Sequence, residues 1–193
     1  MLMNRIIGAF TFRKGVYAEV ESDTAFTQTA WLIVAVVAFL SALGSAASGG
    51  PSFVNWLLGA VLAAVFAVVG FAVAAWVVSW VGQALFKADT NFSEVVRTLG
   101  LAYVWNVVGF LGIVGMVSGL LSCITAPIAF IAWILGLVAW FVALKEALDL
   151  DWTKTIVTAI AGWFAMLIIV FIGGLILGAI GVAVGGVLSI FGR

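Results

Sequence analysis

The chain has 193 residues, of which 66% are hydrophobic and 8% are charged, and its formal net charge is zero. Such an apolar composition excludes an ordinary soluble domain, in which about a quarter of residues are charged, and the scattered basic residues exclude the clustered positive surface of a nucleic-acid-binding protein. The chain has no histidine and a single cysteine, Cys123, which excludes histidine-based catalysis, an intramolecular disulfide and a multi-cysteine metal site within one chain. We therefore expect an integral membrane protein that is not an enzyme, has no cofactor, and contacts lipid and protein.

Three long runs contain no charged residue, and they cover residues 24–86, 98–144 and 155–192. A membrane-spanning helix needs about 20 residues, so each of the first two runs is long enough to cross a bilayer and fold back. No Pro/Ser-rich or charged segment is long enough to link two domains. The sequence therefore predicts an all-α, polytopic transmembrane helix bundle in which residues 1–193 form a single domain.

Residues 2–21 form a mixed segment before the first span. Ile6, Ile7 and Phe10 fall near helical spacing among charged residues, which is typical of an amphipathic helix that lies in the membrane interface. The alternative is a solvated arm that does not touch the membrane. The first span is expected at about 28–47.

The second span is predicted at about 53–83, and a charged connection leads from it to the third span, at about 98–119. In this connection, Asn91 followed three residues later by Glu94 is typical of a capping box, so a short amphipathic helix is expected to begin here. Asn106 is the most noticeable polar residue inside a span. An interhelical hydrogen bond is the structural explanation for it, and a polar contact for a transported solute is the functional one.

An uncharged turn is expected over residues 120–127, because Pro127 is tolerated in the first turn of a new helix. The fourth span then follows at about 128–144. A second polar connection, residues 145–154, contains Asp149 and Asp151, either of which is a suitable cap for the next helix.

The last charge-free run leaves two alternatives open. Either a fifth span covers about 155–178 and a glycine-rich tail follows, or two short spans meet in a turn near Gly173 and Gly174 and the total is six. We favour five spans, because the glycines of this run fall at spacings of three and four residues, which suits one continuous helix that packs closely.

Orientation follows from the lysine and arginine residues, which collect in cytoplasmic segments of membrane proteins. With five spans, all basic residues except Arg193 fall on the same side of the membrane. The N-terminus and both polar connections are therefore expected in the cytoplasm. The basic residues on this side are Arg5, Arg13, Lys14, Lys87, Arg97, Lys145 and Lys154.

Three stretches are similar to a known family of membrane proteins. They are RIIGAFTFRKGVYAEVESD before the first span, NFSEVVRTLGLAYVWNVV at the start of the third, and WFVALKEALDLDWTKTIV between the fourth and the fifth. With the spacing of the spans, the pattern resembles the Yip family, the Ypt/Rab-interacting membrane proteins, and most of all its prokaryotic members.

The resemblance implies five membrane helices, a cytoplasmic N-terminus and, for a prokaryotic member, the plasma (inner) membrane. Eukaryotic members act in vesicle trafficking and bind prenylated Rab-type GTPases and each other. The DLYGP-like signature of those members is missing here, so no GTPase-binding residue is assigned.

The favoured function is that of a non-catalytic membrane protein that binds a protein partner, or a second copy of itself, or organises the bilayer. The alternative is a transporter or channel subunit for ions or small solutes, with Asn106 as its intramembrane polar contact. No metal ligand is assigned. The predicted cytoplasmic contact surface consists of Arg13, Lys14, Phe92, Glu94, Arg97, Glu146, Asp149, Asp151, Trp152 and Lys154.

Overall fold

The computed structural model describes residues 2–45, 53–114 and 119–191, and within these residues it is all-helical. Five of its helical segments are long and apolar enough to cross a membrane, which confirms the predicted five-span bundle. The elements are α1 (Leu2–Phe10), α2 (Val16–Glu21), α3 (Phe26–Ser45), α4 (Phe53–Phe86), α5 (Phe92–Ala102), η2 (Tyr103–Ile113), α7 (Gly119–Leu148) and α8 (Trp152–Phe191).

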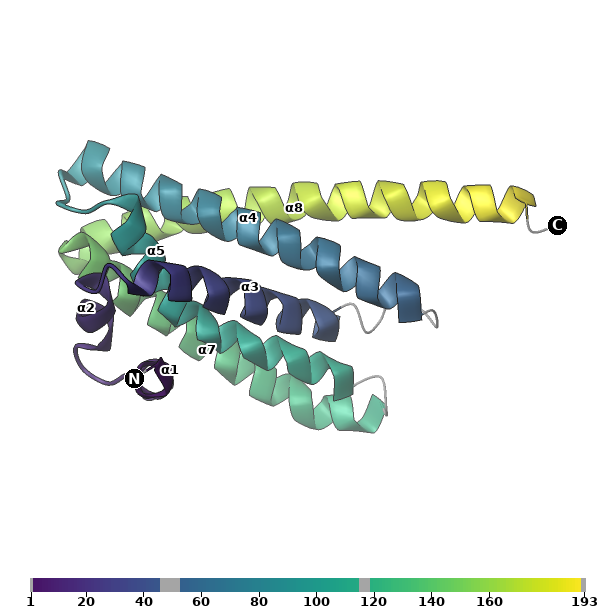
Figure 1. Ribbon diagram of the computed structural model, residues 1–193, viewed down its shortest axis with the longest axis horizontal. Coiled ribbons are helices and arrows are strands. Elements are labelled where there is room, and N and C mark those ends of the chain that lie inside the picture. Colours follow the sequence, from purple (N-terminus) through teal and green to yellow (C-terminus); the bar gives the residue numbers. More distant parts are fainter. Residues whose placement is uncertain (1, 46–52, 115–118, 192–193) are drawn as a thin grey trace.

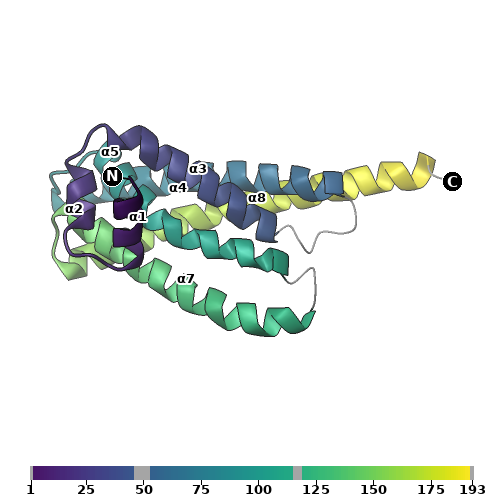
Figure 2. The ribbon, with the colours of Figure 1, turned by 60° about the horizontal axis from the view of Figure 1, so that its bottom comes forward.

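The N-terminal segment forms two short helices, α1 and α2, instead of the one helix expected over residues 2–21. Gly15 separates them with a left-handed backbone (φ 79°), a conformation that glycine adopts without steric strain. Figure 1 and Figure 2 show α1 lying across the direction of the spans and α2 against one end of the bundle. We call this end, formed by α1, α2 and residues 87–91 and 149–151, the polar end.

The third span is a continuous helix that changes its winding. It begins as α5 and continues as the 3₁₀-helix η2, which has 11 residues, although such helices are usually only three or four residues long. Glycines allow η2 to lie directly on α3: a side chain on Gly44 would overlap the carbonyl oxygen of Gly109, and one on Gly112 would lie 2.6 Å from the carbonyl oxygen of Gly44. The change of winding was not predicted from the sequence.

The turn predicted over 120–127 is wrong, because α7 is already helical from Gly119 and Pro127 lies inside it. In lipid every backbone polar group needs a partner within the chain, so an apolar helix continues through a proline when only one hydrogen bond is lost. The predicted end of the first span, at 47, and residues 115–118 of the third lie outside the described residues.

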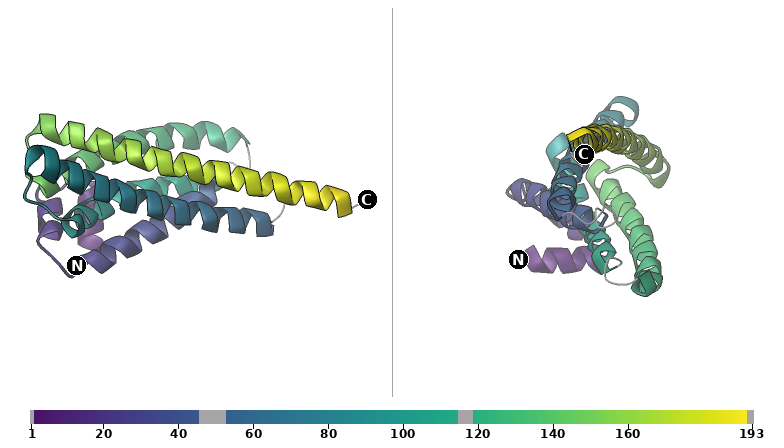
Figure 3. Two further views of the ribbon diagram at one scale, coloured as in Figure 1. Left: turned by 90° about the horizontal axis from the view of Figure 1, so that it is seen from above. Right: turned by 90° about the vertical axis from the view of Figure 1, so that its right-hand side faces the viewer.

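The final run forms a single helix, α8, which has 40 residues and no turn near Gly173. A side chain on Gly173 would lie 2.7 Å from the ring of Phe66, so this glycine packs against α4 and does not mark a turn. The helix is about 60 Å long at 1.5 Å per residue, and its C-terminal part extends beyond the other helices (Figure 3).

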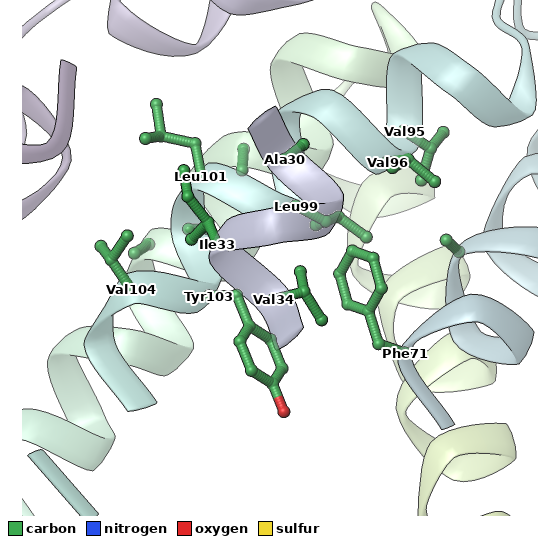
Figure 4. Close-up of a cluster of buried hydrophobic side chains, with 14 of the residues drawn as sticks. Ala30, Ile33, Val34, Phe71, Val95, Val96, Leu99, Leu101, Tyr103 and Val104 are labelled. Carbon is green, nitrogen blue, oxygen red and sulfur yellow. The ribbon is translucent and has the colours of Figure 1, made fainter. Parts of the chain in front are cut away.

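The main hydrophobic core lies between α3, α4, α5 and the start of η2, near the polar end (Figure 4). Gly100 allows this close packing, since a side chain there would lie 2.9 Å from the Cβ atom of Ala30. Farther from the polar end, α7 diverges from α8 (Figure 2). The closely packed part of the bundle is thus the part that supports the polar end.

Candidate functional site

Arg97 joins the N-terminal segment to the third span. It is a charged residue of α5, yet only 4% of its surface is exposed. Its guanidinium donates from Nε (2.9 Å) and Nη2 (2.5 Å) to the backbone carbonyl oxygen of Glu21, and from Nη1 to Oγ1 of Thr27 (3.2 Å). Because the last carbonyls of a helix have no partner within it, Arg97 caps the C-terminal end of α2.

The capping box predicted at the start of α5 is confirmed. The side chain of Asn91 accepts a hydrogen bond from the backbone N–H of Glu94 (3.1 Å), and the Glu94 carboxylate accepts one from the backbone N–H of Asn91 (2.8 Å). Glu94 also lies 3.9 Å from the guanidinium of Arg97. The cap therefore fixes the first turn of α5 and places a carboxylate beside the buried cation.

A network of ion pairs holds α1, α2 and the start of α3 together. Arg5 contacts Glu19 (3.0 Å) and Asp23 (2.7 Å), and Arg13 contacts the same Glu19 (2.5 Å). The hydrogen bond from Arg5 lowers the pKa of the Asp23 carboxyl group. Arg5, Glu19 and Asp23 were not among the predicted site residues, because the turn at Gly15 that brings them together has no spacing pattern that indicates it.

The Glu21 carboxylate is influenced by the charges of Arg97 and three other carboxylates. Burial, followed by the negative charges of Asp149, Glu94 and Glu146, raises the pKa of Glu21 to about 7, and the positive charge of Arg97 opposes this rise. These side chains come from α2, α5, α7 and the connection after α7, so the structure brings together four predicted site residues, Glu94, Arg97, Glu146 and Asp149. Among the described residues, no group of three acidic or sulfur ligands could hold a metal ion.

The other predicted residues lie around this cluster. Arg13 and Lys14 are exposed between α1 and α2. Asp151 and Lys154 pair at 3.6 Å at the start of α8, where Lys145 lies over the ring of Trp152. Asp151 directly precedes α8, and its carboxylate contacts the side chain of Lys154. Asp149 follows α7 and has a left-handed backbone (φ 49°).

Two exposed aromatic residues flank the polar groups. Phe92, at the first position of α5, is 36% exposed and lies beside Trp31, and Trp152, at the first position of α8, is 52% exposed. Rings surrounded by polar groups are typical of protein contact surfaces. Arg97 is buried beneath this surface, so it supports the contact residues and offers no exposed charge itself.

A cavity of about 290 Å³ lies deeper in the bundle, lined mainly by η2 and α7, with residues of α3, α4, α5 and α8 completing its wall. Asn106 lies at its wall, and its side-chain nitrogen donates to the carbonyl oxygen of Tyr103 (3.3 Å), three residues earlier in the same helix. We call this cavity the span cavity. Its aromatic wall consists of Phe71, Tyr103, Trp105, Trp133, Trp140 and Trp163.

A family model described as the Yip1 domain matches residues 7–173, a range that includes α2, the first four spans, both polar connections and α8 as far as residue 173. No curated protein and no solved structure matches the chain.

Proposed function

The chain belongs to the Yip1 domain family of membrane proteins, and we propose that it acts without catalysis, by binding a protein partner or a second copy of itself at the polar end. We further propose that this end faces the cytoplasm, on the inner side of a prokaryotic plasma membrane. The distribution of lysine and arginine residues supports this orientation. In this orientation α1, with Leu2, Met3 and Ile7 exposed, lies in the membrane interface.

One observation carries the proposal: Arg97 fastens α2 to α5 and so joins separate segments of the chain into one surface. The bonds from Arg97 to Glu21 connect residues 76 positions apart. Glu94, Glu146 and Asp149 are near enough for their charges to act on Glu21. A surface assembled from three polar segments, with a ring at each of two helix starts, suits the recognition of another protein.

Site-directed photocrosslinking in intact membranes tests this proposal. A benzophenone amino acid at Phe92 or Trp152 should give an adduct of defined mass with a protein or with the same chain. Phe130 is the matched control, because it is exposed (62%) on the span α7, away from the polar end. Adducts with lipid alone at all three positions would contradict the proposal.

The span cavity is the observation that favours the second candidate, a transporter or channel subunit. A transport route needs polar groups at membrane depth, and Asn106 is such a group. Proteoliposomes with purified protein should then show flux that Asn106→Leu reduces. Absence of flux across a panel of ions and small solutes would count against transport and leave the contact function in place.

A further inference from the structure

The span cavity exists because one face of α7 carries small residues. Ala129, Ala132 and Gly136 line it at spacings of three and four residues, which places them on one side of an α-helix. A side chain on Gly136 would lie 3.0 Å from Cβ of Trp105, so α7 touches η2 there, and the space opens beside this contact. The cavity thus follows from the sequence of α7.

The winding of η2 arranges the polar side of this cavity. With three residues per turn, side chains at positions i and i+3 lie directly above one another. Tyr103, Asn106 and Gly109 therefore form one row, and all three line the cavity. An α-helix would turn this row away by about 60° per turn, since three residues there advance only 300°.

Two polar side chains lie at the wall of the cavity. Asn106 is exposed, and one N–H of its amide donates to the carbonyl oxygen of Tyr103. Nε1 of Trp105, another wall residue, is buried with no hydrogen-bond partner. Polar groups without partners are unfavourable in the hydrocarbon region. A complementary ligand must therefore supply a hydrogen-bonding group.

Three simple occupants fit poorly. An ion would meet no charge, because none of the described lining residues is charged. Water would need roughly ten molecules at about 30 Å³ each, every one with two to four polar partners, and the mainly aromatic and aliphatic wall offers few. A lipid acyl chain has no group to pair with Asn106.

We propose that the span cavity binds an uncharged, membrane-soluble ring compound that carries a hydroxyl group. Its ring would pack against the tryptophan side chains, and its hydroxyl would accept from the free Nδ2–H of Asn106 and donate to Oδ1. The ligand would enter from the bilayer between α7 and α8, both of which line the cavity. This proposal goes beyond the contact function, because no residue of the polar end takes part.

Equilibrium dialysis of the full chain in nanodiscs, against empty nanodiscs of the same lipid, tests the proposal. The probes are 2,6-diisopropylphenol and 1,3-diisopropylbenzene, which differ only in the hydroxyl group. We expect saturable binding of the phenol with one site per chain, and binding about tenfold weaker for the hydrocarbon, as for one lost hydrogen bond. Asn106→Leu should remove this difference.

A cavity-filling variant gives a second, independent test. Ala132→Leu should abolish saturable binding, whereas Ala126→Leu, at an exposed position of the same helix, should preserve it. Thermal unfolding verifies that each variant folds. If Ala132→Leu does not fold, the test is whether Asn106→Leu removes the difference in affinity between the two probes. Uptake equal to that of empty nanodiscs, equal affinity for both probes in the unmodified chain, or saturable binding in a folded Ala132→Leu protein would each overturn the proposal.

Discussion

The guanidinium of Arg97 and the backbone carbonyl oxygen of Glu21 are joined by two hydrogen bonds, of 2.9 Å from Nε and 2.5 Å from Nη2. The contact buries a cation against the end of α2 and leaves the Glu21 carboxylate among three others. Arg97 thus fixes the C-terminal end of α2, and the ionisation of Glu21 opposes the docking of this helix.

Replacement of Arg97 by methionine should release α2. The methionine keeps much of the apolar stem but removes both bonds to Glu21, and a hydrogen bond from a charged group contributes about 1.5–3 kcal/mol. Hydrogen exchange of residues 16–21 should become faster by at least tenfold, and exchange in α4 should stay unchanged. Lys14→Met, at an exposed position, is the matched control, and equal exchange in both variants would contradict this role of Arg97.

The pH dependence of α2 docking follows from Glu21. Its pKa rises from the ordinary 4.5 to about 7 in the docked state, so between these values the docked state keeps a proton that the free segment has lost. Docking should therefore be strongest below pH 4.5, weaken as the pH rises, and stop changing above about pH 7.

Spin labels at Ala18 and Thr153, both exposed, measure this effect in a Cys123→Ser background. Longer distances should be more populated at pH 7.5 than at pH 5. Glu21→Gln should remove the difference, because a neutral amide mimics the protonated acid at every pH. A pH response that persists in Glu21→Gln would assign the effect to another group.

The capping box should stabilise the third span. Asn91→Ala removes the side-chain acceptor for the backbone N–H of Glu94 and should lower the free energy of unfolding by about 1 kcal/mol. Asn91→Ser keeps a neutral acceptor, and its free energy of unfolding should stay within a few tenths of a kcal/mol of that of the unmodified chain. Thermal or denaturant unfolding in detergent distinguishes the two, and equal losses would show that the cap is not the cause.

The close approach of α3 and η2 gives opposite predictions for two glycines. Gly44→Ala places a methyl group against the carbonyl oxygen of Gly109, which the backbone cannot avoid by a rotamer change, so a loss of about 1–3 kcal/mol is expected. Gly59→Ala, with nothing within 4 Å, should stabilise α4 by about 0.5–1 kcal/mol. Unfolding in a mixed-micelle titration measures both, and the same sign for both would contradict the packing.

Reporter fusions test the orientation. Fusions after Lys14 and Asp151 should report a cytoplasmic location, and a fusion after Arg193 should report the opposite side, because α8 crosses the membrane once. A cytoplasmic reporter at Arg193 would instead require the chain to return through the membrane after Gly173.

The sequence predicts most of the architecture, because in a bilayer length and hydropathy decide which segments span. It also predicts the capping box, since the hydrogen bonds of Asn91 and Glu94 close within a single turn. The prediction of a turn at 120–127 is wrong for the same physical reason that the prediction of the spans is right. In lipid, a helix satisfies nearly all of its own backbone hydrogen bonds, so an apolar helix continues through a proline.

Tertiary structure alone decides where the charged residues act and where space is left. Nothing near Arg97 in the sequence indicates that its partner is a carbonyl oxygen 76 residues earlier, so its burial could not be foreseen. The winding of η2 and the span cavity likewise arise where glycines of α3 and η2 meet and small residues of α7 face them. Composition and local spacing therefore determine that this chain forms a five-span membrane bundle, while long-range contacts determine which of its polar groups are supports and which remain available to bind.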